Sequence, residues 1–251
     1  MRGAPNYFAW YARLVTPHLG RRVLEVGCGL GNFTAHLLDR DILIAIDPEP
    51  ECIKRLHERY GGRGDIHAFV RGILDPEFHD LARFHPDSCV CLNVLEHVED
   101  DIGAVRALAS VLSPGAIIVL QLPAFPALYG PIDKNLSHYR RYNRAMIRQL
   151  ARDSGLLIRR MHYSNFIGFF GWWFNAHILR LKAQSARQIE FFDRFLVPAA
   201  SAIERVIRPP FGQSLIAVLQ KPDCLASDMG PAAAAAHPAP TTTRSDPDNT
   251  A

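Results

Sequence analysis

The sequence is poor in cysteine. It has only 5 Cys in 251 residues, and no two of them are spaced as Cys-x-x-Cys. This excludes a disulfide-built secreted scaffold and a cysteine-based zinc motif. Cys89 and Cys91 stand two apart in an apolar run, where a strand directs both to one face as small buried hydrophobic residues. We expect no bound metal.

Long apolar runs are also scarce. The start of the chain, MRGAPNYFAWYARLV, has no unbroken apolar stretch and no small-residue cleavage site, which argues against a signal peptide. Residues 161–179 lack Asp, Glu, Lys and Arg, but histidines, asparagines and glycines interrupt them, so a membrane span is not favoured. We expect a cytoplasmic protein and leave a peripheral contact with a membrane open.

Charge is low and unevenly distributed. Charged residues make up 21% of the chain and hydrophobic residues 48%, a composition typical of a packed core. The formal net charge of +3 averages unlike parts, because residues 138–210 hold 13 Arg or Lys against 4 Asp or Glu. Residues 221–251 are rich in Ala, Pro and Thr and lack aromatic residues, so we expect a disordered tail there. One domain then covers residues 1–220.

Short apolar segments alternate with helical segments in the first half of the domain. The apolar segments are continuous, which is typical of strands in a parallel sheet that is covered on both faces. The expected strands are residues 22–26, 42–46, 66–70, 88–92 and 116–122, and helices are expected to begin at residue 33 and to cover 53–60 and 102–112.

The regular alternation ends at residue 123. Residues 123–143 contain three prolines and are expected to form a lid loop, followed by a helix over 144–154. Strands at 156–163 and 214–219 are expected to pair at one edge, with residues 164–211 as an aromatic-rich, helical inserted subdomain between them. The fold class predicted is α/β, a Rossmann-like doubly wound sheet of seven mostly parallel strands, with an antiparallel last strand.

The strongest local signal is the segment VLEVGCGLGNFT, residues 23–34. A strand, a glycine turn and a helix start follow one another, as a nucleotide-binding βα unit requires. A dinucleotide fingerprint would place its last glycine at position 32, which is Asn32 here, whereas these glycines fall at 27, 29 and 31. Asp47 ends the next strand, where a carboxylate can accept both hydroxyls of a ribose.

Four segments together resemble one family, the class I S-adenosylmethionine-dependent methyltransferases of the small-molecule type. VLEVGCGLGNFT resembles their first motif, IAIDP their second, PDSCVCLNVLEHVEDD their fourth, and LSPGAIIVLQLP the approach to their fifth strand. The resemblance covers roughly residues 20–160 and the last strand. It implies the fold and S-adenosylmethionine as the cofactor, but no particular substrate.

The resemblance also implies cofactor contacts, position by position. The implied contacts of the methionine part are Glu25, Gly27, Cys28 and Gly29, those of the ribose and adenine are Asp47 and Pro48, and those of the amino end are Leu92, Asn93 and Leu95. The third motif departs from the family pattern, because no acidic residue stands where one usually meets the adenine amine. The backbone of Gly72 and Ile73 can replace it, or Asp75 can.

Methyl transfer is an in-line displacement, which depends chiefly on alignment and on the exclusion of water. A general base is needed only for an acceptor that keeps its proton. His97, just past the fourth strand, is a candidate base or a structural histidine. His138 and Tyr139 in the lid loop are further candidates. The expected substrate-binding residues are Tyr7, Tyr11, Arg140, Tyr142 and Trp172.

The sequence therefore predicts a methyltransferase for a small-molecule or lipid-like acceptor, with oxygen slightly favoured over nitrogen or carbon. An arginine of the lid loop could clamp an anionic acceptor. No nucleic-acid reader is recognisable, and a homodimer stays open. The alternatives are a catalytically silent cofactor-binding protein that docks to a membrane or to a protein, and an NAD(P)-dependent reductase.

Overall fold

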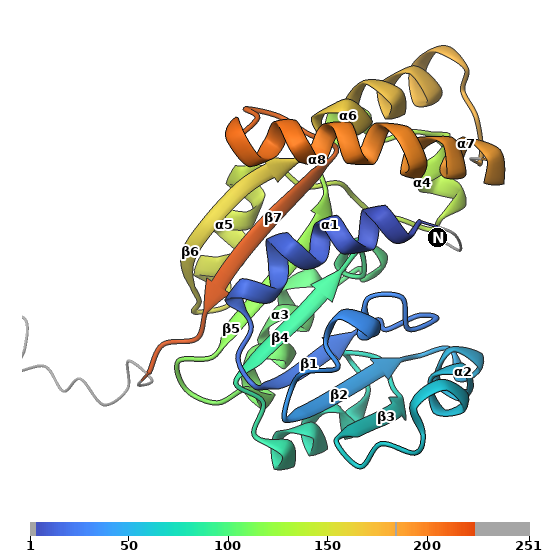
Figure 1. Cartoon of the computed structure of the whole chain (residues 1–251). Coiled ribbons are helices and arrows are strands. Elements are labelled where there is room, and N and C mark those ends of the chain that lie inside the picture. The colour runs from blue at the N-terminus through green and yellow to red at the C-terminus, as the bar shows by residue number, and fades with distance from the viewer. Residues whose placement is uncertain (1–3, 184, 224–251) are drawn as a thin grey trace, which may run out of the picture.

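The computed structural model describes residues 4–183 and 185–223, and a sheet of seven strands forms its centre (Figure 1). The strands are β1 Arg22–Val26, β2 Ile42–Asp47, β3 Ile66–Val70, β4 Ser88–Leu92, β5 Ile117–Pro123, β6 Leu157–Ser164 and β7 Ser214–Gln220. Their order across the sheet is β3-β2-β1-β4-β5-β7-β6. Strands β1 to β5 pair in parallel, and β7 is antiparallel to both β5 and β6. The predicted sheet and its antiparallel last strand are confirmed.

Helices connect and cover the strands. The α-helices are α1 Pro5–Val15, α2 Pro50–Tyr60, α3 Asp101–Val111, α4 Pro131–Asn135, α5 Arg144–Asp153, α6 Phe166–Trp173, α7 Ala186–Phe191 and α8 Val197–Val206. Two π-helical turns, Phe174–Ile178 and Phe192–Leu196, continue α6 and join α7 to α8. None of the helices in the described part of the chain is both long and apolar enough to cross a membrane.

Two expected elements differ in the structure. The helix expected to begin at residue 33 is only a 3-10 turn, Thr34–His36, because few residues separate the glycine loop from β2 and so short a helix gains little. The lid loop, residues 123–143, contains a 3-10 turn and the short helix α4, each beginning at a proline whose fixed φ suits a first helical position. The tail expected from residue 221 is described only to residue 223, and the rest lies outside the described residues.

Alternate residues of the central strands enter two different apolar layers. On one face Leu24 and Ile44 pack with the apolar sides of α3 and α5. On the other face Val23 and Leu43 pack with α1 and α8. Both faces of the central strands are thereby covered, as continuous apolar strands require.

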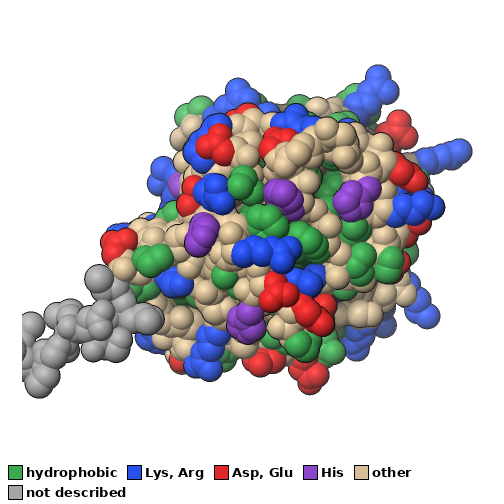
Figure 2. All heavy atoms as spheres, turned by 90° about the horizontal axis from the view of Figure 1, so that it is seen from below, with side chains coloured by type: hydrophobic (Ala, Val, Ile, Leu, Met, Phe, Trp, Pro, Cys, Tyr) green, Lys and Arg blue, Asp and Glu red, His purple; other side chains and the backbone are tan. Residues whose placement is uncertain are grey.

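The insert between β6 and β7 gathers at one end of the molecule. Helices α6, α7 and α8 lie together at the top of Figure 1, with α4 beside them. The face in Figure 2, seen from below, instead carries acidic and basic side chains interspersed.

Candidate active site

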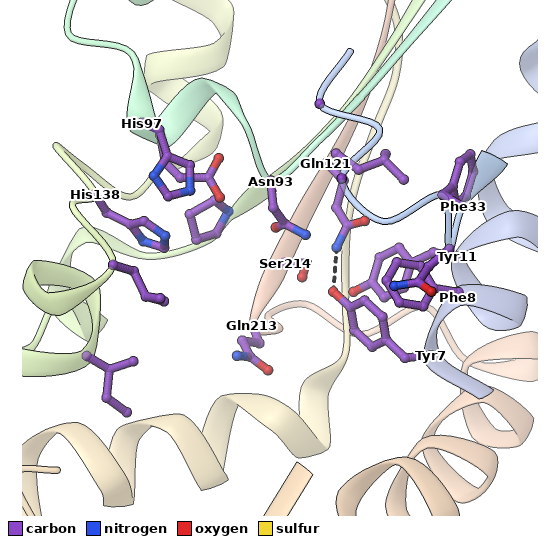
Figure 3. Close-up of a pocket in the computed structure, with 18 of the residues that line it drawn as sticks. Tyr7, Phe8, Tyr11, Phe33, Asn93, His97, Gln121, His138, Gln213 and Ser214 are labelled. Carbon is purple, nitrogen blue, oxygen red and sulfur yellow. Dashed lines mark hydrogen bonds between the residues drawn. The ribbon is translucent and has the colours of Figure 1, made fainter. Parts of the chain in front are cut away.

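A cavity of about 520 Å³ opens at the carboxyl ends of β1, β4 and β5 (Figure 3). Ligands of open α/β sheets bind at this edge. The lining residues are Tyr7, Phe8, Tyr11, Glu25, Val26, Gly27, Cys28, Gly29, Leu30, Asn32, Phe33, Val90, Leu92, Asn93, Glu96, His97, Gln121, Pro123, Ile132, Asn135, Leu136, His138, Arg141, Trp172, Lys182, Ala183, Ile189, Gln213 and Ser214. The cavity thus joins the glycine loop, the lid, α1 and the insert.

The glycine loop follows β1 and forms one wall of the cavity. Gly27, Gly29 and Gly31 have positive φ values of 72°, 52° and 76°, which only glycine adopts without strain. At Gly27 a Cβ would also lie 2.3 Å from Cγ2 of Val94. The backbone N–H of Gly27 donates to the carbonyl of Ile46 at 2.8 Å, which ties the loop to β2.

Asp47, at the end of β2, hydrogen-bonds to this loop on the side away from the cavity. Its Oδ2 accepts a hydrogen bond from the N–H of Gly29 at 2.9 Å, and its Oδ1 accepts one from the N–H of Glu49 at 3.0 Å. Asp47 itself does not line the cavity. Each carboxylate oxygen has a second lone pair, so a ribose hydroxyl can bind beside these contacts.

Glu25 is the acidic residue that lines the cavity next to the loop. Its side chain is 3% exposed, and its Oε2 accepts a hydrogen bond from the Thr34 hydroxyl at 2.7 Å. Burial raises the pKa of Glu25 to about 8, more than the Thr34 hydrogen bond lowers it. The carboxyl therefore holds its proton at neutral pH until a cation approaches.

Apart from Asp47, the cofactor-binding residues predicted from the sequence divide into those that line the cavity and those that do not. Glu25, Gly27, Cys28, Gly29, Leu92 and Asn93 line the cavity. Ile73 and Leu95 instead belong to the apolar core, and Pro48 and Gly72 lie off the cavity wall. The N–H of Gly72 donates to Asp75 at 2.6 Å, so this pair forms a local turn.

The wall opposite the histidines is aromatic and polar. Tyr7, Phe8, Tyr11 and Phe33 lie together on one side in Figure 3. The Tyr7 hydroxyl accepts a hydrogen bond from Nε2 of Gln121 at 2.6 Å. Burial raises the pKa of both tyrosines, which therefore stay protonated and neutral.

Helix α1 reaches the cavity because the insert holds its first turn. The N–H groups of Asn6 and Tyr7 donate to the carboxylate of Asp193 at 3.2 and 2.8 Å. Asp193 lies in the π-helical turn Phe192–Leu196 and is 4% exposed. A residue remote in sequence thus caps α1, which has no side-chain cap of its own.

His97 and His138 lie side by side on the other side of the cavity (Figure 3), with ring centroids 4.6 Å apart. Nδ1 of His138 is 3.0 Å from Oδ1 of Asp133, which also accepts a hydrogen bond from Nε of Arg141 at 2.8 Å. Burial, followed by the neighbouring His138, lowers the pKa of His97, so its ring is neutral at pH 7. The two predicted histidines therefore meet at one end of the cavity.

Three lid residues predicted at the site do not line the cavity. Tyr139 is 53% exposed. Arg140 pairs with Asp101 at 3.0 Å, and Tyr142 is buried with its hydroxyl 3.0 Å from the same carboxylate. Both side chains therefore hold the lid to α3. The neighbour Arg141 lines the cavity instead, with its guanidinium over the ring of Trp172 at 4.5 Å.

Several residues that line the cavity are not predicted from the sequence. Gln121 is the clearest, because it is a single polar residue within the apolar strand β5, and its buried Oε1 has no hydrogen-bond partner in the described part of the chain. A single amide in an apolar strand indicates a functional position and could have been identified from the sequence. Gln213 and Lys182 gave no such signal, since only the tertiary fold brings them to the cavity.

Comparisons with known proteins agree with this geometry. A family model described as a methyltransferase domain matches residues 3–186. The chain belongs to that family, the class I S-adenosylmethionine-dependent methyltransferases. Its cofactor is accordingly S-adenosylmethionine rather than the dinucleotide of a reductase.

Curated relatives match part of the chain. An uncharacterized methyltransferase of Mycobacterium bovis is 29% identical over 52% of this chain and 50% of its own length. A ubiquinone biosynthesis O-methyltransferase of Xanthomonas axonopodis pv. citri is 36% identical over 40% of this chain and 42% of its own length. The chain thus spans about half the length of the curated relatives it matches, or less.

Solved structures share the fold over most of the chain. An S-adenosylmethionine-dependent methyltransferase from Archaeoglobus fulgidus aligns with a TM-score of 0.57 at 16% identity, covering 88% of this chain and 96% of its own. The N-methyltransferase NodS from Bradyrhizobium japonicum, in complex with S-adenosylhomocysteine, aligns with a TM-score of 0.53 at 16% identity, covering 88% and 89%. At this identity the likeness concerns the fold.

Proposed function

We propose that this protein transfers the methyl group of S-adenosylmethionine to an oxygen atom of a small or lipid-like acceptor. The observation that carries the proposal is the single cavity that begins at the glycine loop and ends at His97 and His138. Cofactor and acceptor can therefore occupy the same enclosed space. Enclosure and alignment supply most of what this displacement needs.

The reaction requires one bond to form as another breaks. The acceptor oxygen attacks the methyl carbon, the carbon–sulfur bond breaks, and the sulfonium becomes the neutral thioether of S-adenosylhomocysteine. The acceptor proton leaves at the histidine end of the cavity, where His97 is neutral and able to take it. His138, whose Nδ1 is 3.0 Å from Oδ1 of Asp133, packs against His97 at this end of the cavity.

Oxygen is the favoured acceptor atom for two reasons. One curated relative is named an O-methyltransferase of ubiquinone biosynthesis. The aromatic side of the cavity, with Tyr7, Phe8, Tyr11 and Phe33, also suits a flat phenolic ring. Trp172 of α6 adds a further aromatic ring to the lining. A phenol keeps its proton at neutral pH, which explains why proton-accepting groups line the cavity.

The surface of the insert supports a lipid-like acceptor or a peripheral membrane contact. Several large side chains are half exposed there, namely Phe170, Trp173, Phe174, Phe191 and Phe195. They lie in a part of the sequence with a surplus of Arg and Lys, a combination that suits an interface with anionic lipid. Two other roles for this face are proposed. The first is a homodimer interface. The second is an interface with a different protein, because one solved neighbour comes from a complex with the Haloferax volcanii Trm112 methyltransferase activator.

A turnover assay tests the function. Purified protein is incubated with S-adenosylmethionine and a panel of phenols, hydroquinones, amines and carbon acids, and methylated product and S-adenosylhomocysteine are quantified by mass spectrometry. We expect a phenolic or quinol product, with none when S-adenosylhomocysteine replaces the donor. Cofactor binding without product across the panel would instead favour a catalytically silent docking protein.

A further inference from the structure

We propose that Glu96, His97 and His138 bind one divalent transition-metal ion at the acceptor end of the cavity. One ligand atom from each residue lies within 4.8 Å of the other two. All three residues line the cavity. The role of the ion in methyl transfer rests on the proposed function, whereas the binding of the ion can be tested independently of it.

The first argument is the carboxylate of Glu96. This side chain is 1% exposed, and its Oε2 has no hydrogen-bond partner within the described residues. The nearby guanidinium of Arg141 is engaged by Asp133 at 2.8 Å. A buried carboxylate oxygen without a partner is costly, and a cation in the cavity removes that cost.

The second argument is the orientation of the histidines. Nδ1 of His138 is held by Asp133, which leaves Nε2 free as a ligand. The His97 ring packs edge-on against the His138 ring, with ring centroids 4.6 Å apart. Histidine ligands in metal sites are characteristically fixed as His138 is, through the ring nitrogen that does not bind the ion.

Asp133 is itself rigidly placed. It is fully buried, accepts a hydrogen bond from the N–H of Gly130 at 2.9 Å, and pairs with Arg141. The lid thereby presents His138 in one orientation opposite Glu96 and His97, which follow β4. Two rigid elements, rather than one flexible loop, would hold the ion.

The donor set indicates which ion fits. Two imidazoles and one carboxylate are ligands of Zn²⁺, Mn²⁺, Fe²⁺ or Co²⁺ rather than of Ca²⁺. Donor atoms that lie within 4.8 Å of one another can converge on one ion with bonds of about 2.0–2.2 Å. Three protein ligands leave at least one position open, and that position faces the cavity.

The open position gives the site its chemistry. A hydroxyl of the acceptor would coordinate the ion there, and the positive charge would lower the hydroxyl pKa so that its proton passes to solvent. The coordinated oxygen then attacks the methyl carbon as the carbon–sulfur bond breaks. In this arrangement the ion activates the acceptor hydroxyl in place of His97 acting as a base, and the methyl transfer itself is the same as in the proposed function.

The sequence does not predict a metal, because no cysteine pair has the spacing of a zinc motif. These ligands are two adjacent residues after one strand and a third in the lid, a spacing that forms no sequence motif. Only the fold of the lid over β4 brings them together.

Metal titration of the full-length protein tests the proposal. The protein is dialysed against a chelator, and Zn²⁺ and Co²⁺ are titrated by calorimetry and by the visible absorption of Co²⁺. We expect one ion per chain. We also expect Glu96→Gln and His138→Ala each to weaken binding by about tenfold or more, with His97→Ala as a third variant should either fail to fold.

The matched control is His57→Ala, because His57 is an exposed histidine on α2. It should leave ion binding unchanged, and circular dichroism should show every variant folded. Equal binding by the wild type and all three ligand variants, or no stoichiometric binding at all, would overturn the metal site. S-adenosylhomocysteine binding, measured in parallel, reports on the proposed function separately, since it survives the loss of a metal site.

Discussion

Asp47 and Glu25 are two acidic residues that the sequence placed at one cofactor, and the structure gives them different positions. Asp47 accepts hydrogen bonds from the N–H groups of Gly29 and Glu49 and supports the glycine loop from outside the cavity. Glu25 lines the cavity and is almost completely buried. The residue type and spacing could be predicted from the sequence, whereas the side-chain partners depend on the turn that the positive-φ glycines make.

The protonation of Glu25 gives a testable pH effect. Its pKa of about 8 in the free protein means that the carboxyl is mostly neutral at pH 7. The ammonium group of the cofactor favours the ionised form, so binding should lower this pKa and release a proton. Calorimetry of S-adenosylhomocysteine at pH 7 in two buffers of different ionisation enthalpy measures that release.

We expect nearly one proton released per cofactor bound by the wild type, and close to none by Glu25→Gln. The sign follows from the raised pKa: affinity should increase as the pH rises toward 8 and level off above it. Equal proton release by the two proteins would show that Glu25 does not face the ammonium group.

At the scale of elements, the site depends on contacts between segments far apart in the chain. Helix α1 supplies Tyr7 and Tyr11 to the cavity, and Asp193 in the insert caps its first turn. π-Helical turns recur at functional sites, and the turn Phe192–Leu196 directs this carboxylate at α1. The insert thus does more than cover the sheet, because it positions part of the cavity wall.

Removal of that cap should loosen α1. Asp193→Ala leaves the N–H groups of Asn6 and Tyr7 without this acceptor, and because the Tyr7 N–H is buried the change should cost about 1–3 kcal/mol of folding free energy. Denaturant unfolding measures the loss, and hydrogen exchange should show faster exchange in α1 than in the strands. The control Glu190→Ala changes an exposed acid on α7, and stability equal to wild type in both variants would contradict the cap.

Strands β1, β2 and β5 were predictable because their apolar runs are continuous and end at glycine, aspartate or proline. The side-chain directions in the lid, residues 123–143, were less predictable. Ser137 has a positive φ of 58°, a conformation that its residue type does not indicate. Arg141 lines the cavity, while Arg140 pairs with Asp101. The sequence could predict that the lid meets the site, but not which of its residues do.

At the scale of the whole molecule, the two ends differ in composition and in role. Strands β1 to β4 carry the glycine loop, and the face seen from below in Figure 2 has both signs of charge interspersed. The lid and insert carry the basic and aromatic residues, and half-exposed rings such as Trp173 and Phe191. The first part identifies the cofactor, and we expect the second part to select the acceptor.

The measurement that tests this account most directly is a calorimetric titration of the full-length protein with S-adenosylhomocysteine, with NADH in a parallel experiment. The account predicts one S-adenosylhomocysteine per chain and no NADH. Asp47→Ala should weaken binding by about 1.5–3 kcal/mol, since a hydrogen bond to a charged group is lost, and the exposed-site control Asp80→Ala should not. Binding of NADH without S-adenosylhomocysteine, or an Asp47→Ala variant with wild-type affinity, would contradict it.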